Sequence, residues 1–173
     1  MKKVLVFVVI IFLVSLGFMF FSKKLALPKS QLSNNITLPE TVDTSVTPIT
    51  NVQASFAIFT NGTFRIFTAA MYHNLSQDVY IEADNPNIVQ VKKTDTSWND
   101  FFLTLPFSLT SECLTTGTKE TFCTGSEGAL QFYINGKKTT DALSRKINDG
   151  DKLLVTFGKE SDVQIKRQID KIP

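Results

Sequence analysis

The sequence predicts an α+β domain attached to an N-terminal membrane anchor. Short strand-like runs separated by tight turns fill most of residues 53–173, and a single amphipathic helical pattern lies among them. A continuous apolar run, well separated from these elements, opens the chain. Strands grouped around one central helix are typical of α+β domains rather than of doubly wound parallel sheets. We therefore expect an anchor over residues 1–24, a linker over 25–52 and a folded domain over 53–173.

The anchor is predicted from residues 4–21, an uncharged run of 18 residues. As a helix it would span roughly 27 Å, close to the hydrocarbon thickness of a bilayer. A cleaved signal peptide is the alternative, but its apolar core is typically about 7–15 residues and ends in small residues. Here Lys23 and Lys24 follow, and no cysteine lies near the end of the run for lipoprotein processing. We expect an uncleaved transmembrane signal anchor that attaches the chain to the membrane.

Lysines flank the apolar run on both sides, but the N-terminal tail is only three residues long and also carries the α-amino group. The positive-inside rule therefore favours a cytoplasmic N-terminus and a domain outside the cell membrane. Residues 25–52 hold Pro28, Pro39 and Pro48 among many Ser, Thr and Asn residues, with no helical or alternating period. Such a composition is typical of an extended, flexible tether.

The charges argue against a nucleic-acid partner. Residues 1–52 hold five lysines against two carboxylates, whereas residues 53–173 hold thirteen Lys and Arg against fourteen Asp and Glu. The positive excess thus belongs to the anchor and linker, and the domain is nearly neutral. Proteins that bind nucleic acids normally carry a basic stripe on the folded part.

The domain opens with a predicted hairpin at Asn61-Gly62, because the type I′ turn needs positive φ at both central residues. The flanking apolar residues alternate as in strands: Phe56, Ile58, Phe64 and Ile66. Two further strands are expected over 78–82 and 87–91, joined by a turn at 84–86.

A helix is predicted after residues 94–97, which offer several N-cap side chains. One apolar face recurs at i, i+3, i+4 and i+7: Trp98, Phe101, Phe102 and Leu105. Pro106 ends the helix, because the residue before proline avoids the α region. We interpret the aromatic face as core packing, with a ligand groove as the alternative.

Residues 107–128 are expected to form a loop that holds both cysteines. Strands are predicted over 129–134 and 152–157, with tight turns at 135–137 and 149–151 and a strand end at Gly158. Ser161 is expected to cap a last helix with an apolar face at i, i+4 and i+7: Ile165, Ile169 and Ile172.

This order of strands around one helix resembles the β-grasp (ubiquitin-like) fold. Residues 133–137 (YINGK) and 147–153 (INDGDKL) are similar to the last two strands of β-grasp modules. From about residue 54 the chain also resembles a family of small membrane-anchored proteins of archaea and uncultured bacteria, some labelled protein-disulfide isomerase. The matching segments are Tyr80-Ile81-Glu82, 96–102 (TSWNDFF), Cys113, Cys123 and the Asn-Gly-Lys and Asp-Gly-Asp turns.

The chain departs from that family in its histidines. Relatives alternate His-x-His on their early strands, whereas the corresponding runs here are 55–59 (SFAIF) and 89–92 (VQVK). The chain's one histidine, His73, matches none of those positions. Because zinc needs three or four such ligands, we expect no metal site and interpret His73 as a surface or turn residue.

Cys113 and Cys123 are the most informative pair of side chains. A catalytic dithiol usually occurs as Cys-x-x-Cys at the start of a helix, where the thiolate is stabilised. Nine residues separate these two in a polar stretch, which favours a structural disulfide in an oxidising compartment. A redox-active pair, and free or metal-linked thiols, remain as alternatives.

Two carboxylate pairs, Glu82 with Asp84 and Asp149 with Asp151, have spacings that acid–base catalysis or calcium can use. Asp149-Gly150-Asp151 is first of all a turn signal. No glycine-rich phosphate loop or nucleophile elbow occurs. We therefore predict a non-enzymatic binding module without a cofactor. The alternatives are a thiol–disulfide oxidoreductase that uses Cys113 and Cys123, and an enzyme whose site is assembled from loops.

Overall fold

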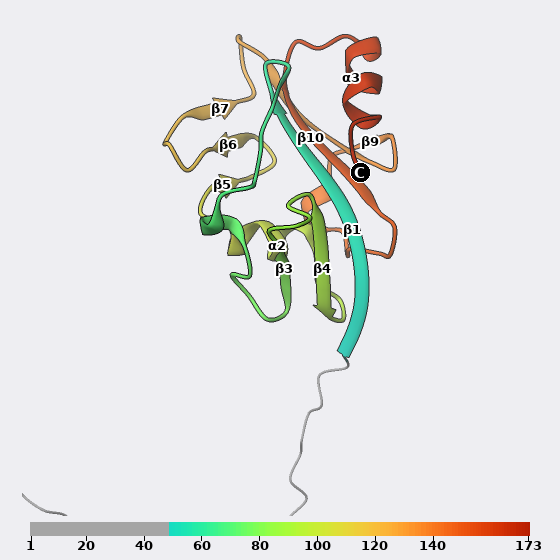
Figure 1. The fold of residues 1–173 in the computed structure, drawn as a ribbon. Helices are drawn as coiled ribbons and strands as arrows, with labels where there is room; N and C mark the ends of the chain where they lie inside the picture. The colour runs from blue at the N-terminus through green and yellow to red at the C-terminus, as the bar shows by residue number, and fades with distance from the viewer. Residues whose placement is uncertain (1–48) are drawn as a thin grey trace, which may run out of the picture. The chain divides into compact units, whose positions relative to one another are not determined.

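The computed structural model describes residues 49–173; the predicted anchor at 4–21 and most of the predicted linker lie outside them. The described residues form an α+β domain with a mixed sheet, a smaller antiparallel sheet and two α-helices (Figure 1). This confirms the α+β class that the sequence predicts. Within this part of the chain, no helix is both long and apolar enough to cross a bilayer.

The main sheet is built around a central parallel pair, β1 (Ile49–Thr60) and β10 (Lys152–Gly158). All other neighbours in this sheet are antiparallel, in the order β3-β4-β1-β10-β8-β9, and β2 also pairs with β1. These flanking strands are β2 (Thr63–Phe64), β3 (Val79–Ile81), β4 (Ile88–Lys93), β8 (Ala129–Ile134) and β9 (Lys137–Thr139).

Both faces of the central pair are covered, which explains its nearly continuous apolar sequence. Phe56 and Ile58 of β1 belong to the large core, which α2 (Trp98–Thr104) covers. Their neighbours Ala57 and Phe59 point to the opposite face and join a smaller core under α3 (Asp162–Ile169). The alternation of side chains along a strand therefore divides β1 between two cores.

Helix α2 begins and ends where the sequence predicts. Ser97 Oγ accepts a hydrogen bond from the Asp100 N–H (3.1 Å), and Asp100 Oδ2 accepts one from the Ser97 N–H (2.8 Å). Leu105, before Pro106, has an extended ψ of 151° and ends the helix. The predicted apolar face is buried and packs in the large core, namely Trp98, Phe101, Phe102 and Leu105. Core packing, not a groove, is therefore the role of this face.

Helix α3 also follows its prediction. The side chains of Ser161 and Gln164 form a capping box. Ile165 and Ile172 are buried against the sheet and Ile169 is partly buried, although the helix itself ends at Ile169.

Two tight turns have the backbone that their Asn-Gly sequences predict. Asn61 and Gly62 have φ of 49° and 75°, and Asn135 and Gly136 have φ of 51° and 77°. In the first hairpin, however, pairing with β1 ends at Phe64, and the side chain of Ile66 is 68% exposed. The expectation that Ile66 continues a strand was therefore wrong.

Two predicted boundaries need correction. β1 begins at Ile49, so residues 49–52 belong to the strand and not to the linker. They are ordered by pairing with β4, where Val52 lies opposite Val91. The predicted loop 107–128 contains a three-stranded antiparallel sheet with strands β5 (Ser108–Leu109), β6 (Cys113–Thr115) and β7 (Thr121–Cys123). These strands are too short to show an alternating pattern in the sequence.

Candidate functional site

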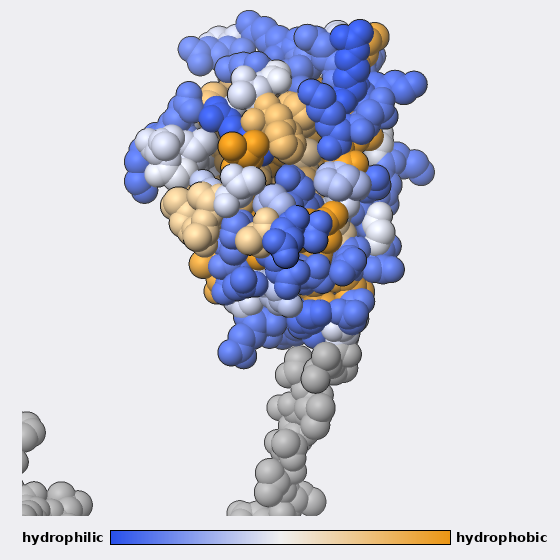
Figure 2. Space-filling view, viewed as in Figure 1, coloured by the Kyte–Doolittle hydropathy of each residue, from blue (hydrophilic) through white to orange (hydrophobic). Residues whose placement is uncertain are grey.

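An apolar pocket opens where the β1–β2 hairpin, the short 3-10 helix η1 (Ala70–Tyr72) and the β6–β7 hairpin meet. Its volume is about 360 Å³, within the range of small-molecule sites. Figure 2 shows hydrophobic residues gathered in the middle of this face among hydrophilic ones. The apolar lining comprises Ile58, Phe64, Phe67, Tyr72, Phe107 and Leu114.

Aromatic rings hold one wall of the pocket in place. The ring of Phe67 meets that of Tyr72 edge-on at 5.2 Å between centroids, and that of Phe107 at 5.9 Å. His73 ends η1, and its Nε2 lies 2.8 Å from the carbonyl oxygen of Phe67. This geometry requires Nε2 to donate, so His73 ties η1 to the wall. It is a turn residue, as the sequence predicts.

The mouth of the pocket carries large apolar side chains in contact with solvent. Ile66 is 68% and Met71 is 53% exposed. Across from them lies Gly117, at the tip of the β6–β7 hairpin. A Cβ added to Gly117 would lie 3.7 Å from the Tyr72 hydroxyl and 4.0 Å from Met71 Cε. The hairpin tip therefore closes directly over η1 and forms the second wall.

The one charged side chain lining the pocket is neutralised locally. Arg65 pairs with Glu120 at 3.2 Å, and its Nε donates to Thr60 Oγ1 at 2.6 Å. Its guanidinium also lies 5.2 Å from the centroid of the Phe122 ring. The other polar side-chain groups of the lining are hydroxyls, those of Thr63, Tyr72, Thr116 and Thr118. The pocket is suited to an uncharged, mainly apolar molecule.

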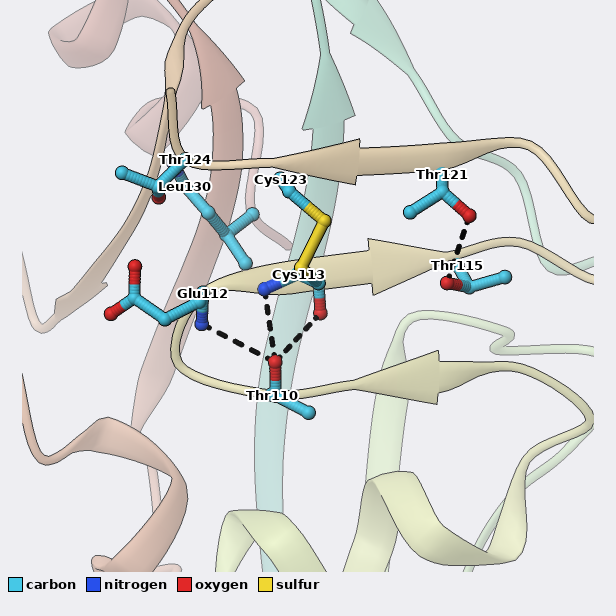
Figure 3. The surroundings of a disulfide bond; sticks show 8 residues. All are labelled: Thr110, Glu112, Cys113, Thr115, Thr121, Cys123, Thr124 and Leu130. Carbon is cyan, nitrogen blue, oxygen red and sulfur yellow. Dashed lines mark hydrogen bonds between the residues drawn. A yellow bond between two sulfur atoms is a disulfide. The ribbon is translucent and has the colours of Figure 1, made fainter.

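The predicted disulfide is present. Cys113 and Cys123 lie directly opposite each other on β6 and β7, with their Cα atoms 4.1 Å apart. Figure 3 shows the bridge across the two strands, next to Thr110, whose Oγ1 accepts from the Cys113 N–H at 2.9 Å. Cys123 is exposed, while the alternating residues Leu114 and Phe122 are buried. The bridge thus lies on the outer face of the small sheet, and neither sulfur is at a helix N-terminus.

The predicted carboxylate pairs do not join the pocket. Asp149 Oδ1 accepts from the Gln53 N–H at 2.9 Å, and Asp151 is buried in a hydrogen-bonded turn. Glu82 and Asp84 follow β3, and the Asp84 side chain is exposed. Over residues 49–173, no group of three or more His, Cys, Asp or Glu side chains is placed to hold a metal ion.

Neither a known protein family, nor a curated protein, nor a solved structure matches this chain. The candidate site therefore rests on the chain's own geometry. Sequence reasoning missed the pocket, because its lining comes from two segments about fifty residues apart. Two local signals were available: Ile66 just beyond the hairpin, and Gly117 among the threonines between the cysteines.

Proposed function

We propose that this chain is a membrane-anchored, extracytoplasmic binding module, without catalytic activity, whose ligand enters the pocket between η1 and the β6–β7 hairpin. The observation that carries the proposal is an apolar pocket of about 360 Å³ with exposed Ile66 and Met71 at its mouth. Exposed apolar residues around a concavity are typical of binding sites. The apolar run at residues 4–21 supports the anchor.

The arrangement of the strands supports a β-grasp assignment for the domain. Its long first strand and its last strand lie parallel at the centre of the sheet, with antiparallel strands on either side and α2 packed on one face. A β-grasp scaffold is compatible with a binding role, but a fold alone does not determine function.

The pocket also indicates the chemistry of the ligand. Its volume would hold a ligand of about a dozen heavy atoms, taking each atom as the size of a water molecule or methylene group. The Arg65–Glu120 pair leaves no free charge in the lining. We therefore infer a neutral, mainly apolar small molecule that packs against the rings of Phe64, Phe67 and Phe107.

The test uses the full-length chain in lipid nanodiscs and an uncharged alkyl diazirine as a photoreactive probe. We expect saturable labelling of peptides that contain Phe67, Met71 and Leu114, suppressed by an excess of the parent alkane. Gly117→Leu should lower this labelling about tenfold, because its side chain extends over the mouth. Gly125→Leu is the matched control, since a Cβ there meets little besides the Cys123 carbonyl oxygen at 3.9 Å. Labelling spread evenly over the surface would contradict the proposal.

A second candidate function is thiol–disulfide exchange, favoured by the exposure of Cys123. An exposed disulfide is open to attack by a thiolate, and the resemblance suggested by the sequence motifs, to proteins labelled protein-disulfide isomerase, would imply the same function. The reduction potential of the Cys113–Cys123 pair separates the two functions. A value below about −300 mV is typical of a structural bridge, whereas about −120 to −270 mV is typical of oxidoreductases.

A further inference from the structure

The disulfide and the pocket share one element. Leu114, Thr116, Gly117 and Thr118 line the pocket, and all four lie within the loop that Cys113–Cys123 closes. The bridge therefore holds together the two ends of the hairpin that forms the second wall. The first wall, which comprises β2 and η1, contains neither cysteine.

Besides the bridge, this hairpin is held by the Arg65–Glu120 ion pair at 3.2 Å, by the Arg65 guanidinium against the Phe122 ring, and by short strand pairings. β6 and β7 are three residues long, and β6 gains only two pairings from β5. The hydroxyls of Thr115 and Thr121 meet at 3.1 Å, but on the exposed face. Phe122 packs on Phe157, and Leu114 is buried. The pairings are only two or three residues long and the Arg65–Glu120 pair is exposed to solvent, and an exposed ion pair contributes little to stability, so the covalent bridge is a large part of what holds the tip over η1.

The bridge is also accessible to a reductant. Cys123 is exposed, and Figure 3 shows the disulfide running between the neighbouring strands β6 and β7. A small dithiol can attack one sulfur and then close into its own disulfide. The Cys113–Cys123 sulfur–sulfur bond breaks and each cysteine becomes a thiol. The dithiol supplies both electrons and both protons and is oxidised.

We propose that the redox state of Cys113–Cys123 controls the affinity of the apolar pocket. In the oxidised chain the hairpin tip stays against Tyr72 and Met71, and the pocket is complete. In the reduced chain the tip moves away for much of the time, and the apparent affinity falls in proportion to the fraction of molecules in which the wall is still in place. This inference rests on the proposed binding function of the same pocket.

The experiment compares oxidised and dithiothreitol-reduced full-length chain in nanodiscs, titrated with the same alkyl diazirine. We expect the reduced chain to bind the probe about tenfold more weakly, which corresponds to a hairpin wall that is in place about one tenth of the time. Reoxidation should restore the affinity. Hydrogen exchange should become faster over residues 113–123 and stay slow in β1 and β10. The double variant Cys113→Ala/Cys123→Ala should bind the probe as weakly as the reduced chain does, and dithiothreitol should not change its binding.

The outcomes separate the two proposals. Absence of pocket labelling in the oxidised chain would overturn the binding function, and the redox control with it. Equal labelling of oxidised and reduced chains would overturn the redox control alone. Faster exchange throughout β1 and β10 on reduction would also overturn it, because the bridge would then act as a general staple of the domain.

Discussion

Asp151 is a buried carboxylate that joins two turns. Its Oδ1 accepts from Asn135 Nδ2 at 2.8 Å, and its Oδ2 accepts from the Asn148 N–H at 2.9 Å. Asn135 in turn accepts from the Lys152 N–H at 2.8 Å. The carboxylate thus fixes the β8–β9 turn against the start of β10, and its oxygens are engaged in structural hydrogen bonds.

Asp151→Ala should therefore destabilise the domain by about 1.5–3 kcal/mol, because it removes the charged acceptor of the hydrogen bonds from the Asn135 side chain and the Asn148 N–H. Asp84→Ala is the matched control, since its side chain is exposed, and it should change stability by less than about 0.5 kcal/mol. Urea titration followed by fluorescence measures both, with the single tryptophan, the fully buried Trp98, as the reporter. Equal effects of the two substitutions would contradict this role for Asp151.

Asp100 links helix capping to pH. Hydrogen bonds from the backbone and then the side chain of Ser97 lower the pKa of Asp100 from its ordinary value of 3.8, and Lys93 adds a smaller effect. A carboxyl pKa lowered by folding contributes stability that is present above the unfolded value and lost as the pH falls through the folded value. Because Asp100 is largely exposed, this contribution is small.

Ser97→Ala should raise the pKa of Asp100 toward 3.8 and cost about 1 kcal/mol through loss of the N-cap. Carboxyl-carbon NMR across the acid range measures the pKa, and urea titration measures the stability. Ser111→Ala, at an exposed serine outside the helices, should change neither quantity. An unchanged Asp100 pKa in Ser97→Ala would show that the hydroxyl does not hold the carboxylate.

At the scale of elements, α3 covers the second face of the main sheet. Ile165 and Ile172 pack with Ala57, Phe59 and Leu154 in a core separate from the large one. The amino group of Lys171 also lies 5.7 Å from the centroid of the Phe59 ring. This small core lets the central strands be apolar on both faces.

Ile165→Asp should destabilise the domain by about 3 kcal/mol or more, since it places a carboxylate in an apolar core. Val163→Asp is the matched control on the same helix, where the side chain is 61% exposed. Urea titration compares the two, and hydrogen exchange of α3 shows whether the helix detaches. A similar loss of stability in both variants would mean that α3 does not dock through Ile165.

The small sheet β5–β7 is stabilised in a different way from the main sheet. Its strands are too short to bury much surface, and their pairing brings Cys113 opposite Cys123. Closing a loop of about this size by a disulfide contributes roughly 2.5–3 kcal/mol through the entropy of the unfolded chain. The pocket wall is thus made from an element that depends on covalent support.

At the scale of the whole molecule, the proposed function requires a tethered domain. Full-length chain should fractionate with membranes and resist a carbonate wash, because an apolar helix over residues 4–21 is expected to span the bilayer. A chain without residues 1–24 is the control and should be soluble. In intact cells, an amine reagent that cannot cross membranes should modify Lys137, an exposed residue of β9. Modification only after lysis would contradict an outward-facing domain.

The sequence alone determined the local features of this protein. The two Asn-Gly turns, an N-cap within residues 94–97 and the stop at Pro106 were predicted correctly, because each depends on interactions within a few residues. The α+β class and the alternation of buried and exposed residues could be predicted from hydrophobic periodicity, because this periodicity is visible within a few consecutive residues. The disulfide was also expected, since nine residues separate the two cysteines and this spacing does not fit a catalytic Cys-x-x-Cys pair.

Only the tertiary structure decided which distant segments meet. The parallel pairing of β1 with β10 joins residues nearly one hundred positions apart, and the pairing of β1 with β4 draws residues 49–52 out of the predicted linker. The pocket exists because η1 and the tip at Gly117 approach each other. Such contacts depend on the burial available to the whole chain and on the entropy of closing long loops, and no local pattern encodes either.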